Sequence, residues 1–196
     1  MYKYFVNNLD EHAELMLRLR ELEGVVGRGV AALANVVKAG GKIMLCGNGG
    51  SAADCQHIAA EFTGRFIKDR RPLPAISLCT DTSALTCIGN DYSFDEIFSR
   101  QVTALGAPGD CLIAISTSGN SRNVLRAVEE ANSIGLLTLG LSGHDGGELA
   151  RHCSLNIIVP SSVTARIQEA HILIAHTLCG GVEQELGLSP KDDVGT

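Results

Sequence analysis

Ile43-Met44-Leu45-Cys46-Gly47-Asn48-Gly49-Gly50-Ser51 joins an apolar run directly to a loop of small and polar residues that opens a helical pattern. The arrangement returns where Cys111-Leu112-Ile113-Ala114-Ile115 leads into Ser116-Thr117-Ser118-Gly119-Asn120-Ser121. A helix amino terminus offers unpaired N–H groups and a positive dipole end, and small residues let an anion approach it. The four hydroxyls of the second loop can also donate to phosphate oxygens. The two loops therefore predict a site for a small phosphorylated molecule.

Other interpretations of these loops are weaker. Each could be an ordinary strand-to-helix turn with a capping hydroxyl, but a cap needs one hydroxyl and the second loop has four. The first loop is not a Walker loop, because no lysine follows its last glycine. It is not a dinucleotide fingerprint either, because Ala52 stands where the third glycine would be.

Apolar runs and helical patterns alternate along most of the chain. Strands are predicted at 42–46, 75–79, 111–116, 136–141 and 155–159. Helices are predicted at 51–66, at 83–105 with a break near Asn90-Asp91, at 121–134, near 146–151 and at 164–186. This alternation indicates an α/β fold, a three-layer α/β/α sandwich around a doubly wound five-stranded parallel sheet. Ligands bind beyond the carboxyl ends of such strands, where both loops fall.

Two helical patterns precede the first strand. Residues 8–23 place three leucines on one face, and a second pattern of valines and leucine ends at Gly40-Gly41. Gly24, Gly27 and Gly29 predict a break between the two helices. We expect a helical oligomerisation segment at 1–40, because such a pair often packs on another subunit, then a main domain at 41–188 and a tail at 189–196.

The composition excludes several classes of protein. A net charge of −6 and 4% aromatic residues argue against nucleic-acid binding, which relies on basic and stacking side chains. No apolar run approaches the roughly 18 residues of a membrane span, and the amino terminus has no signal-peptide pattern. The seven cysteines are scattered without a C-x-x-C pair. We therefore expect a cytoplasmic protein without disulfides.

His57 and Glu61 are the first candidates for chemistry. They stand four residues apart on the helix predicted at 51–66 and so share one face. The pair could hold a metal ion, as zinc sites on helices do, or could be an ordinary surface contact. A carboxylate and an imidazole can also work without metal. One removes a proton beside a sugar carbonyl and the other protonates the enediolate oxygen.

The last predicted helix supplies further candidates. Gln168 and His176 stand two turns apart on an apolar helix, where polar residues need partners. His171 is the rival histidine and could instead be a buried, hydrogen-bonded residue. Asn90-Asp91 could be a ligand or a capping turn. The weaker candidates are Arg65 and Asp81, whereas surface positions are expected for His12, His144 and His152.

Taken together, these motifs resemble the sugar-isomerase (SIS) family, whose fold is flavodoxin-like, and within it the phosphoheptose isomerases. The resemblance covers nearly the whole chain, to about residue 186. The residues that carry it are Gly47-Asn48-Gly49-Gly50-Ser51, His57 with Glu61, Ile88-Gly89-Asn90-Asp91, Phe98-Ser99-Arg100, Ser116-Thr117-Ser118-Gly119-Asn120-Ser121 and Arg166-Ile167-Gln168-Glu169.

The resemblance implies conversion of D-sedoheptulose 7-phosphate to D-glycero-D-manno-heptose 7-phosphate, the first step toward nucleotide-activated heptose. It also implies a homotetramer with active sites between subunits and one zinc ion per subunit. Zinc would be held by His57, Glu61, Gln168 and His176, with Glu61 as base and His176 as acid. Phosphate would bind Ser116, Thr117, Ser118 and Ser121. The sugar would contact Asn48, Gly49, Gly50, Ser51, Glu61, Asn90, Asp91 and Gln168.

Two tensions and two rivals accompany this interpretation. A zinc-bound carboxylate is a poorer base, so zinc and proton transfer compete for Glu61. Ala165 stands where some relatives carry an acidic residue. One rival is a non-catalytic SIS regulator that binds a replication initiator, a group that lacks the equivalents of Glu61 and His176. The other is an isomerase of another sugar phosphate, whose relatives often carry extra domains or different loops.

Overall fold

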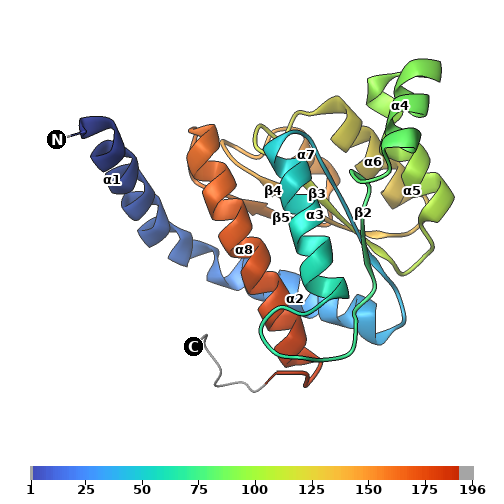
Figure 1. Cartoon of the computed structure of the whole chain (residues 1–196), viewed down its shortest axis with the longest axis horizontal. Coiled ribbons are helices and arrows are strands. Elements are labelled where there is room, and N and C mark those ends of the chain that lie inside the picture. Colours follow the sequence, from blue (N-terminus) through green and yellow to red (C-terminus); the bar gives the residue numbers. More distant parts are fainter. Residues whose placement is uncertain (1, 190–196) are drawn as a thin grey trace.

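Five parallel strands form the centre of the protein (Figure 1). The computed structural model describes residues 2–189. The strands lie in the order β2-β1-β3-β4-β5. Their bounds are β1 Ile43–Gly47, β2 Ala75–Ser77, β3 Cys111–Ser116, β4 Leu137–Ser142 and β5 Leu155–Ile158. The predicted five-stranded parallel sheet is therefore confirmed, with strand ends that differ by at most two residues.

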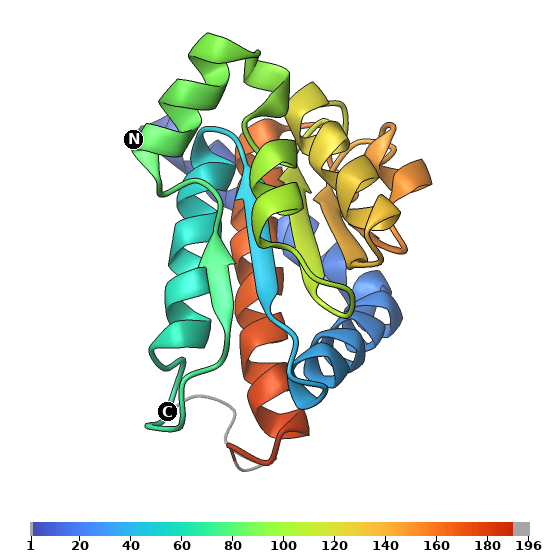
Figure 2. The same ribbon diagram turned by 90° about the vertical axis from the view of Figure 1, so that its right-hand side faces the viewer.

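Helices cover both faces of this sheet and give the three predicted layers (Figure 2). One face carries α1 Lys3–Arg18, η1 Leu19–Leu22, α2 Glu23–Lys38, α3 Gly50–Thr63 and α8 Thr164–Glu185. The other face carries α4 Thr82–Asp91, η2 Phe94–Glu96, α5 Ser99–Leu105, α6 Arg122–Ser133 and α7 Leu149–His152. The helix predicted over 83–105 is thus broken after Asp91, as expected.

The strands divide their side chains between two apolar cores. In β1, Ile43 and Leu45 face the core under α2, α3 and α8, whereas Met44 and Cys46 face the core under α5 and α6. Because both faces of a parallel sheet are covered, its central strands are apolar at most positions rather than at alternate ones. This explains why the strands appear in the sequence as short continuous apolar runs.

The amino-terminal helices differ from the prediction. Helix α1 begins at Lys3 rather than residue 8, and the break falls in η1 rather than at the glycines, which lie inside α2. A Cβ atom added to Gly29 would lie 3.1 Å from Leu178 Cδ2 and 3.3 Å from Leu139 Cδ1. This glycine is therefore used for close packing of α2 on α8 and the sheet, not for a turn. Helix α2 ends at Lys38, just before Gly40, as predicted.

The helices and the cysteines bear on the expectations about membrane spans and disulfides. Over residues 2–189, no helix combines the length and apolar character needed to cross a membrane. All seven cysteines are free thiols. The predicted tail lies outside the described residues, apart from Ser189.

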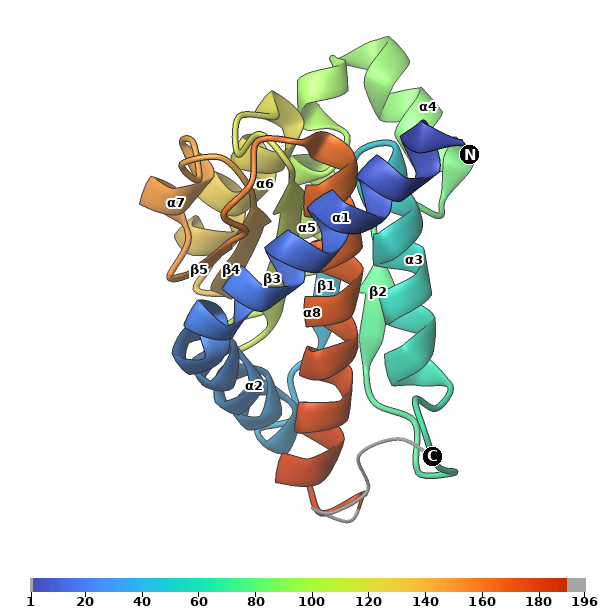
Figure 3. The same ribbon diagram turned by 90° about the vertical axis from the view of Figure 1, so that its left-hand side faces the viewer.

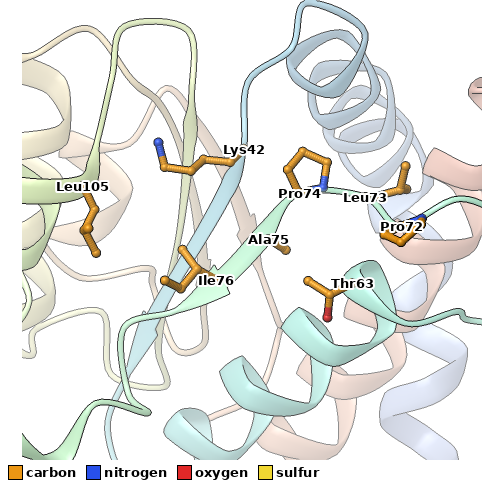
Figure 4. Close-up of a pocket in the computed structure, with 8 residues that line it drawn as sticks. All are labelled: Lys42, Thr63, Pro72, Leu73, Pro74, Ala75, Ile76 and Leu105. Atoms are coloured by element: carbon orange, nitrogen blue, oxygen red, sulfur yellow. The ribbon is translucent and has the colours of Figure 1, made fainter.

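Edge strand β2 borders a groove of about 590 Å³ (Figure 4). Lys42, Thr63 and Leu105 line it, and Lys42 directly precedes β1. The groove therefore lies toward the amino ends of the strands, opposite the loops predicted to bind phosphate, and contains none of the predicted site residues.

Two glycines of α2 provide a matched test of this packing. Gly27 is exposed with open space around its Cα, whereas Gly29 is buried. We expect Gly27→Ala to raise the free energy of unfolding by about 1 kcal/mol, because alanine is the better helix former. Gly29→Ala should give a smaller gain or a loss, because its methyl group must displace two leucines. Equal gains in urea unfolding would show that Gly29 does not limit the approach of α2.

Candidate active site

Three predicted ligands lie together in the structure. His57 and Glu61 come from α3, and His176 comes from α8. His57 Nε2 lies 3.1 Å from Glu61 Oε1 and 3.3 Å from His176 Nε2. One potential ligand atom from each residue lies within 4.8 Å of the others. The side chain of His57 is half exposed and that of Glu61 is 23% exposed, so the cluster is open to solvent on one side.

Parallel packing of two helices creates this cluster. Helices α3 and α8 lie side by side on one face of the sheet, and both start at its carboxyl edge (Figure 3). Gly50 at the start of α3 contacts Gln168 near the start of α8. About two turns further along, His57 meets His176. Residues 119 positions apart in the sequence thus come into contact.

Two groups near the cluster were not predicted. The Phe66 ring stacks on the His176 imidazole, with ring centroids 5.4 Å apart and planes 28° apart. Asp54 stands one turn before His57 on α3. Burial raises the pKa of Asp54, and the charges of His57 and His176 partly oppose this. The spacing of Asp54 from His57, three residues on a helix, was a usable signal. Phe66 lies in a loop and gave none.

Gln168 occupies a different place from the three other predicted ligands. Its amide lies directly against Gly50, so a Cβ atom at position 50 would collide with Nε2. Gln168 and His176 are separated by eight residues of α8, about 12 Å along the helix axis. The Gln168 amide thus lies against the amino end of α3, about two helical turns from His176.

The β3–α6 loop has the form of an anion seat. Ser116 Oγ donates to Ser121 Oγ at 3.0 Å, and Ser121 is the N-cap of α6 but makes no side-chain capping bond. Gly119 has a φ of +68°, and a Cβ atom there would collide with the carbonyl of Gly146. Thr117 is half-buried and Ser118 is exposed, so their hydroxyls remain accessible. The first amides of α6 precede the bonds within the helix, so its amino end offers N–H groups beside four hydroxyls, although the Val124 amide is bonded to Asn123 Oδ1.

The two predicted loops are joined by a reciprocal amide pair. Asn48 Nδ2 donates to Asn123 Oδ1, and Asn123 Nδ2 donates to Asn48 Oδ1, both at 2.8 Å. Asn123 is buried on α6 and was not predicted. Its signal in the sequence was a polar residue on the apolar face of a helix. Gly49, with a φ of +56°, and the buried Ser51 complete the first loop.

The remaining polar candidates lie apart from the cluster. Asn90 and Asp91 are exposed at the end of α4, where Asn90 Nδ2 donates to Asp91 Oδ1 at 2.8 Å. Hydrogen bonds from Asn90 and Cys87 lower the pKa of Asp91. Asp81 caps α4 by accepting from the Ala84 amide at 2.9 Å. Arg65 is exposed and donates to the carbonyl of Ile67.

The other histidines are now assigned. His171 is buried, and its Nε2 lies 3.1 Å from the carbonyl oxygen of Ser142, so the alternative of a buried, hydrogen-bonded residue is correct. His12 joins α1 to α8 through Glu169 at 2.8 Å, although a surface position was expected. Its side chain is still 42% exposed. His144 and His152 are exposed, as predicted.

Comparison with known proteins finds relatives that match most of this chain in sequence and in fold. A sequence model of the SIS domain family matches residues 8–143. A phosphoheptose isomerase of Rhodospirillum rubrum is 52% identical over 174 residues, which cover 89% of this chain and 93% of that protein. The phosphoheptose isomerase structure from Neisseria gonorrhoeae has 42% identity and a TM-score of 0.89, covering 93% of this chain and 98% of that one. The structure from Francisella tularensis has 35% identity and a TM-score of 0.90, covering 93% and 97%.

Buried His171 makes the stability depend on pH. Burial lowers its pKa from 6.5 to about 4, so the folded protein holds it neutral while the unfolded chain binds a proton. We expect this contribution to be fully present above pH 6.5 and to be lost as the pH falls toward 4, by at most about 3 kcal/mol. His171→Gln should flatten the pH dependence of urea unfolding in this window. The exposed control His152→Gln should not, and an equal effect of both would refute the assignment.

Proposed function

Because the chain belongs to the SIS domain family, and within it to the phosphoheptose isomerases, we propose that it interconverts D-sedoheptulose 7-phosphate and D-glycero-D-manno-heptose 7-phosphate. It is an aldose–ketose isomerase, and its reaction belongs to heptose biosynthesis. The observation that carries this assignment is the convergence of His57 and Glu61 from α3 with His176 from α8. A carboxylate and imidazoles at one point are the groups that an enediol mechanism needs.

The β3–α6 loop would hold the phosphate. The hydroxyls of Ser116, Thr117, Ser118 and Ser121 would join the amino end of α6 in binding a dianion, since no lysine is required at such a site. The sugar would then extend past the start of α3 toward the histidines. Residues proposed to contact the sugar are Asn48, Gly49, Gly50, Ser51, Glu61, Asn90, Asp91 and Gln168.

The proton would move within the cluster. Glu61 removes a proton from C1 of the open-chain ketose, and the C1–H electron pair forms the double bond of the enediol. His176 gives a proton to the oxygen on C2, so no net charge builds up there. Return of the proton from Glu61 to C2, with transfer of the O1 proton to His176, completes the aldehyde and restores both residues. No oxidant or reductant is needed, because hydrogen only changes position within the sugar.

The same three residues fit a zinc ion. Two imidazole nitrogens bound to one tetrahedral zinc at about 2.0–2.1 Å lie about 3.3 Å apart. His57 Nε2 and His176 Nε2 are 3.3 Å apart. Two histidines and one glutamate are a known zinc donor set, and Gln168 is the fourth proposed ligand. Bound zinc would polarise the sugar carbonyl as a Lewis acid.

We also propose that the enzyme is a cytoplasmic homotetramer with active sites between subunits. Helix α1 supports this, because Tyr4, Phe5, Leu9 and Leu17 are 50–70% exposed along it. Large apolar side chains gathered on one element typify a protein interface. Within residues 2–189, the side-chain hydrogen bonds of Asn90 and Asp91 join them to each other and to Cys87, and none reaches another proposed site residue. A site shared between subunits would explain their proposed contact with the sugar.

Glu61→Gln tests the proton transfer. Incubation with sedoheptulose 7-phosphate, followed by NMR of the products, should show formation of the aldoheptose 7-phosphate by the wild type. Glu61→Gln should lose at least about a hundredfold in kcat, because general-base catalysis contributes that much. It should still bind the sugar phosphate in calorimetry, because the phosphate seat is intact. The exposed Glu148→Gln should behave as wild type, and full turnover by Glu61→Gln would remove Glu61 from the base role.

Removal of zinc tests the metal site separately. We expect chelation to lower kcat and added zinc to restore it, with one zinc bound per subunit by elemental analysis. His57→Gln should reduce zinc content, since this residue is assigned to the metal and to no proton transfer. If metal-free protein retains full activity, the histidines would act only as acid and base.

A further inference from the structure

We propose that Arg70 and Glu183 are positioning residues that set the orientation of His176 and Glu61. The proposal rests on the proposed function, because it concerns the same catalytic groups. Arg70 lies in the loop after α3, and Glu183 lies in the last turn of α8. Neither contacts a side chain of the histidine cluster: Arg70 acts through the backbone of Glu61, and Glu183 acts through Phe66.

The two residues form a buried ion pair. Arg70 Nε donates to Glu183 Oε1 at 2.7 Å, and the two side chains are 2% and 1% exposed. Burying two charges is costly unless the geometry is good and other hydrogen bonds compensate. Within residues 2–189, Glu183 Oε2 has no hydrogen-bond partner. The carboxylate of Glu183 therefore makes its contacts through Oε1, which accepts from both Arg70 Nε and the Phe66 amide.

Arg70 caps the carboxyl end of α3. Its Nη2 donates to the carbonyl of Glu61 at 2.7 Å. Its Nη1 donates to the carbonyls of Phe62 at 2.7 Å and Gly64 at 2.8 Å. The last carbonyls of a helix lack partners within the helix, and a positive charge there is favourable. The guanidinium thus holds the backbone of the catalytic Glu61 itself.

Glu183 controls the other side of the cluster through Phe66. The Phe66 amide donates to Glu183 Oε1 at 3.2 Å, which fixes the backbone from which the ring extends. The ring lies on the His176 imidazole. It also packs on Gly180, where a Cβ atom would come within 3.2 Å of Phe66 Cε1. A continuous chain of contacts therefore runs from Arg70 through Glu183 and Phe66 to His176.

A purely structural role makes a different prediction from a positioning role. If the ion pair only stabilises the fold, its loss lowers the melting temperature and leaves the surroundings of His176 unchanged. If it positions Phe66, its loss must move the His176 ring signals and reduce kcat. KM should change little, because the proposed phosphate seat lies at the far end of α3 and α8.

The experiment uses the full chain with ¹³C-labelled histidine. In NMR spectra, Phe66→Leu should shift the His176 Hε1 resonance downfield, because the ring that shields it is removed. Arg70→Lys, which retains charge but loses the fork, should move the same resonance in the same direction. Both variants should lower kcat by about 10- to 100-fold, the usual effect of residues that orient a catalytic group. The double variant should be no worse than Arg70→Lys alone, because the loss of Arg70 already releases the Phe66 ring.

Two further variants keep the outcome clear. Glu183→Gln retains an oxygen that can accept from Phe66 and Arg70, and should preserve the His176 resonance. Asp110→Asn weakens the ion pair of buried Asp110 with Lys42, which lies at the amino ends of the strands, away from the histidines. This variant should lower the melting temperature without moving the His176 resonance. An unmoved resonance in Arg70→Lys, or additive losses in the double variant, would overturn the proposal. Failure of the wild type to isomerise the heptose would refute the proposed function alone, because the NMR shifts do not depend on turnover.

Discussion

Parallel packing of α3 against α8 is the contact on which the site depends. Each helix follows a strand end or loop at the carboxyl edge of the sheet, so both run in one direction across the same face. The two helices therefore contact each other at successive levels, first at Gly50 and Gln168 and then at His57 and His176. A shift of one helix by a single turn, about 5 Å, would separate the imidazoles and leave neither a proton-transfer pair nor a metal site.

The rest of the fold keeps this pair of helices in place. The two apolar cores fix the sheet between the layers, and Gly29 lets α2 approach α8 and the sheet closely. At the carboxyl edge, Ser116 of β3 pairs with Ser142 of β4, which brings the anion seat next to the buried His171. The proposed site therefore has its phosphate end in loops and its proton-transfer end on helices.

The sequence predicts those parts of the structure that have a local period. Continuous apolar runs alternating with helical patterns predict the strands and the three layers. The spacing of four residues predicts that His57 and Glu61 share one helix face. Arg70, Glu183 and Asn123 could not be assigned in this way, because their partners lie 75 to 113 residues away. The glycines of α2 were misinterpreted for a related reason. The sequence alone does not distinguish a glycine that bends the chain from one that lets a neighbouring helix pack closely. The distinction depends on the residues packed against it, such as Leu178 and Leu139 at Gly29.

The Asn48–Asn123 pair has a consequence for recognition of the sugar. A primary amide has two donor hydrogens and two acceptor lone pairs, and Asn48 uses one of each on Asn123. One donor and one acceptor remain on Asn48. A hydroxyl, which can accept and donate at once, complements both of them without breaking the bridge. A phosphate oxygen can only accept, so in the proposed sugar contact it would leave the free acceptor of Asn48 without a donor, and a sugar hydroxyl would be the better fit.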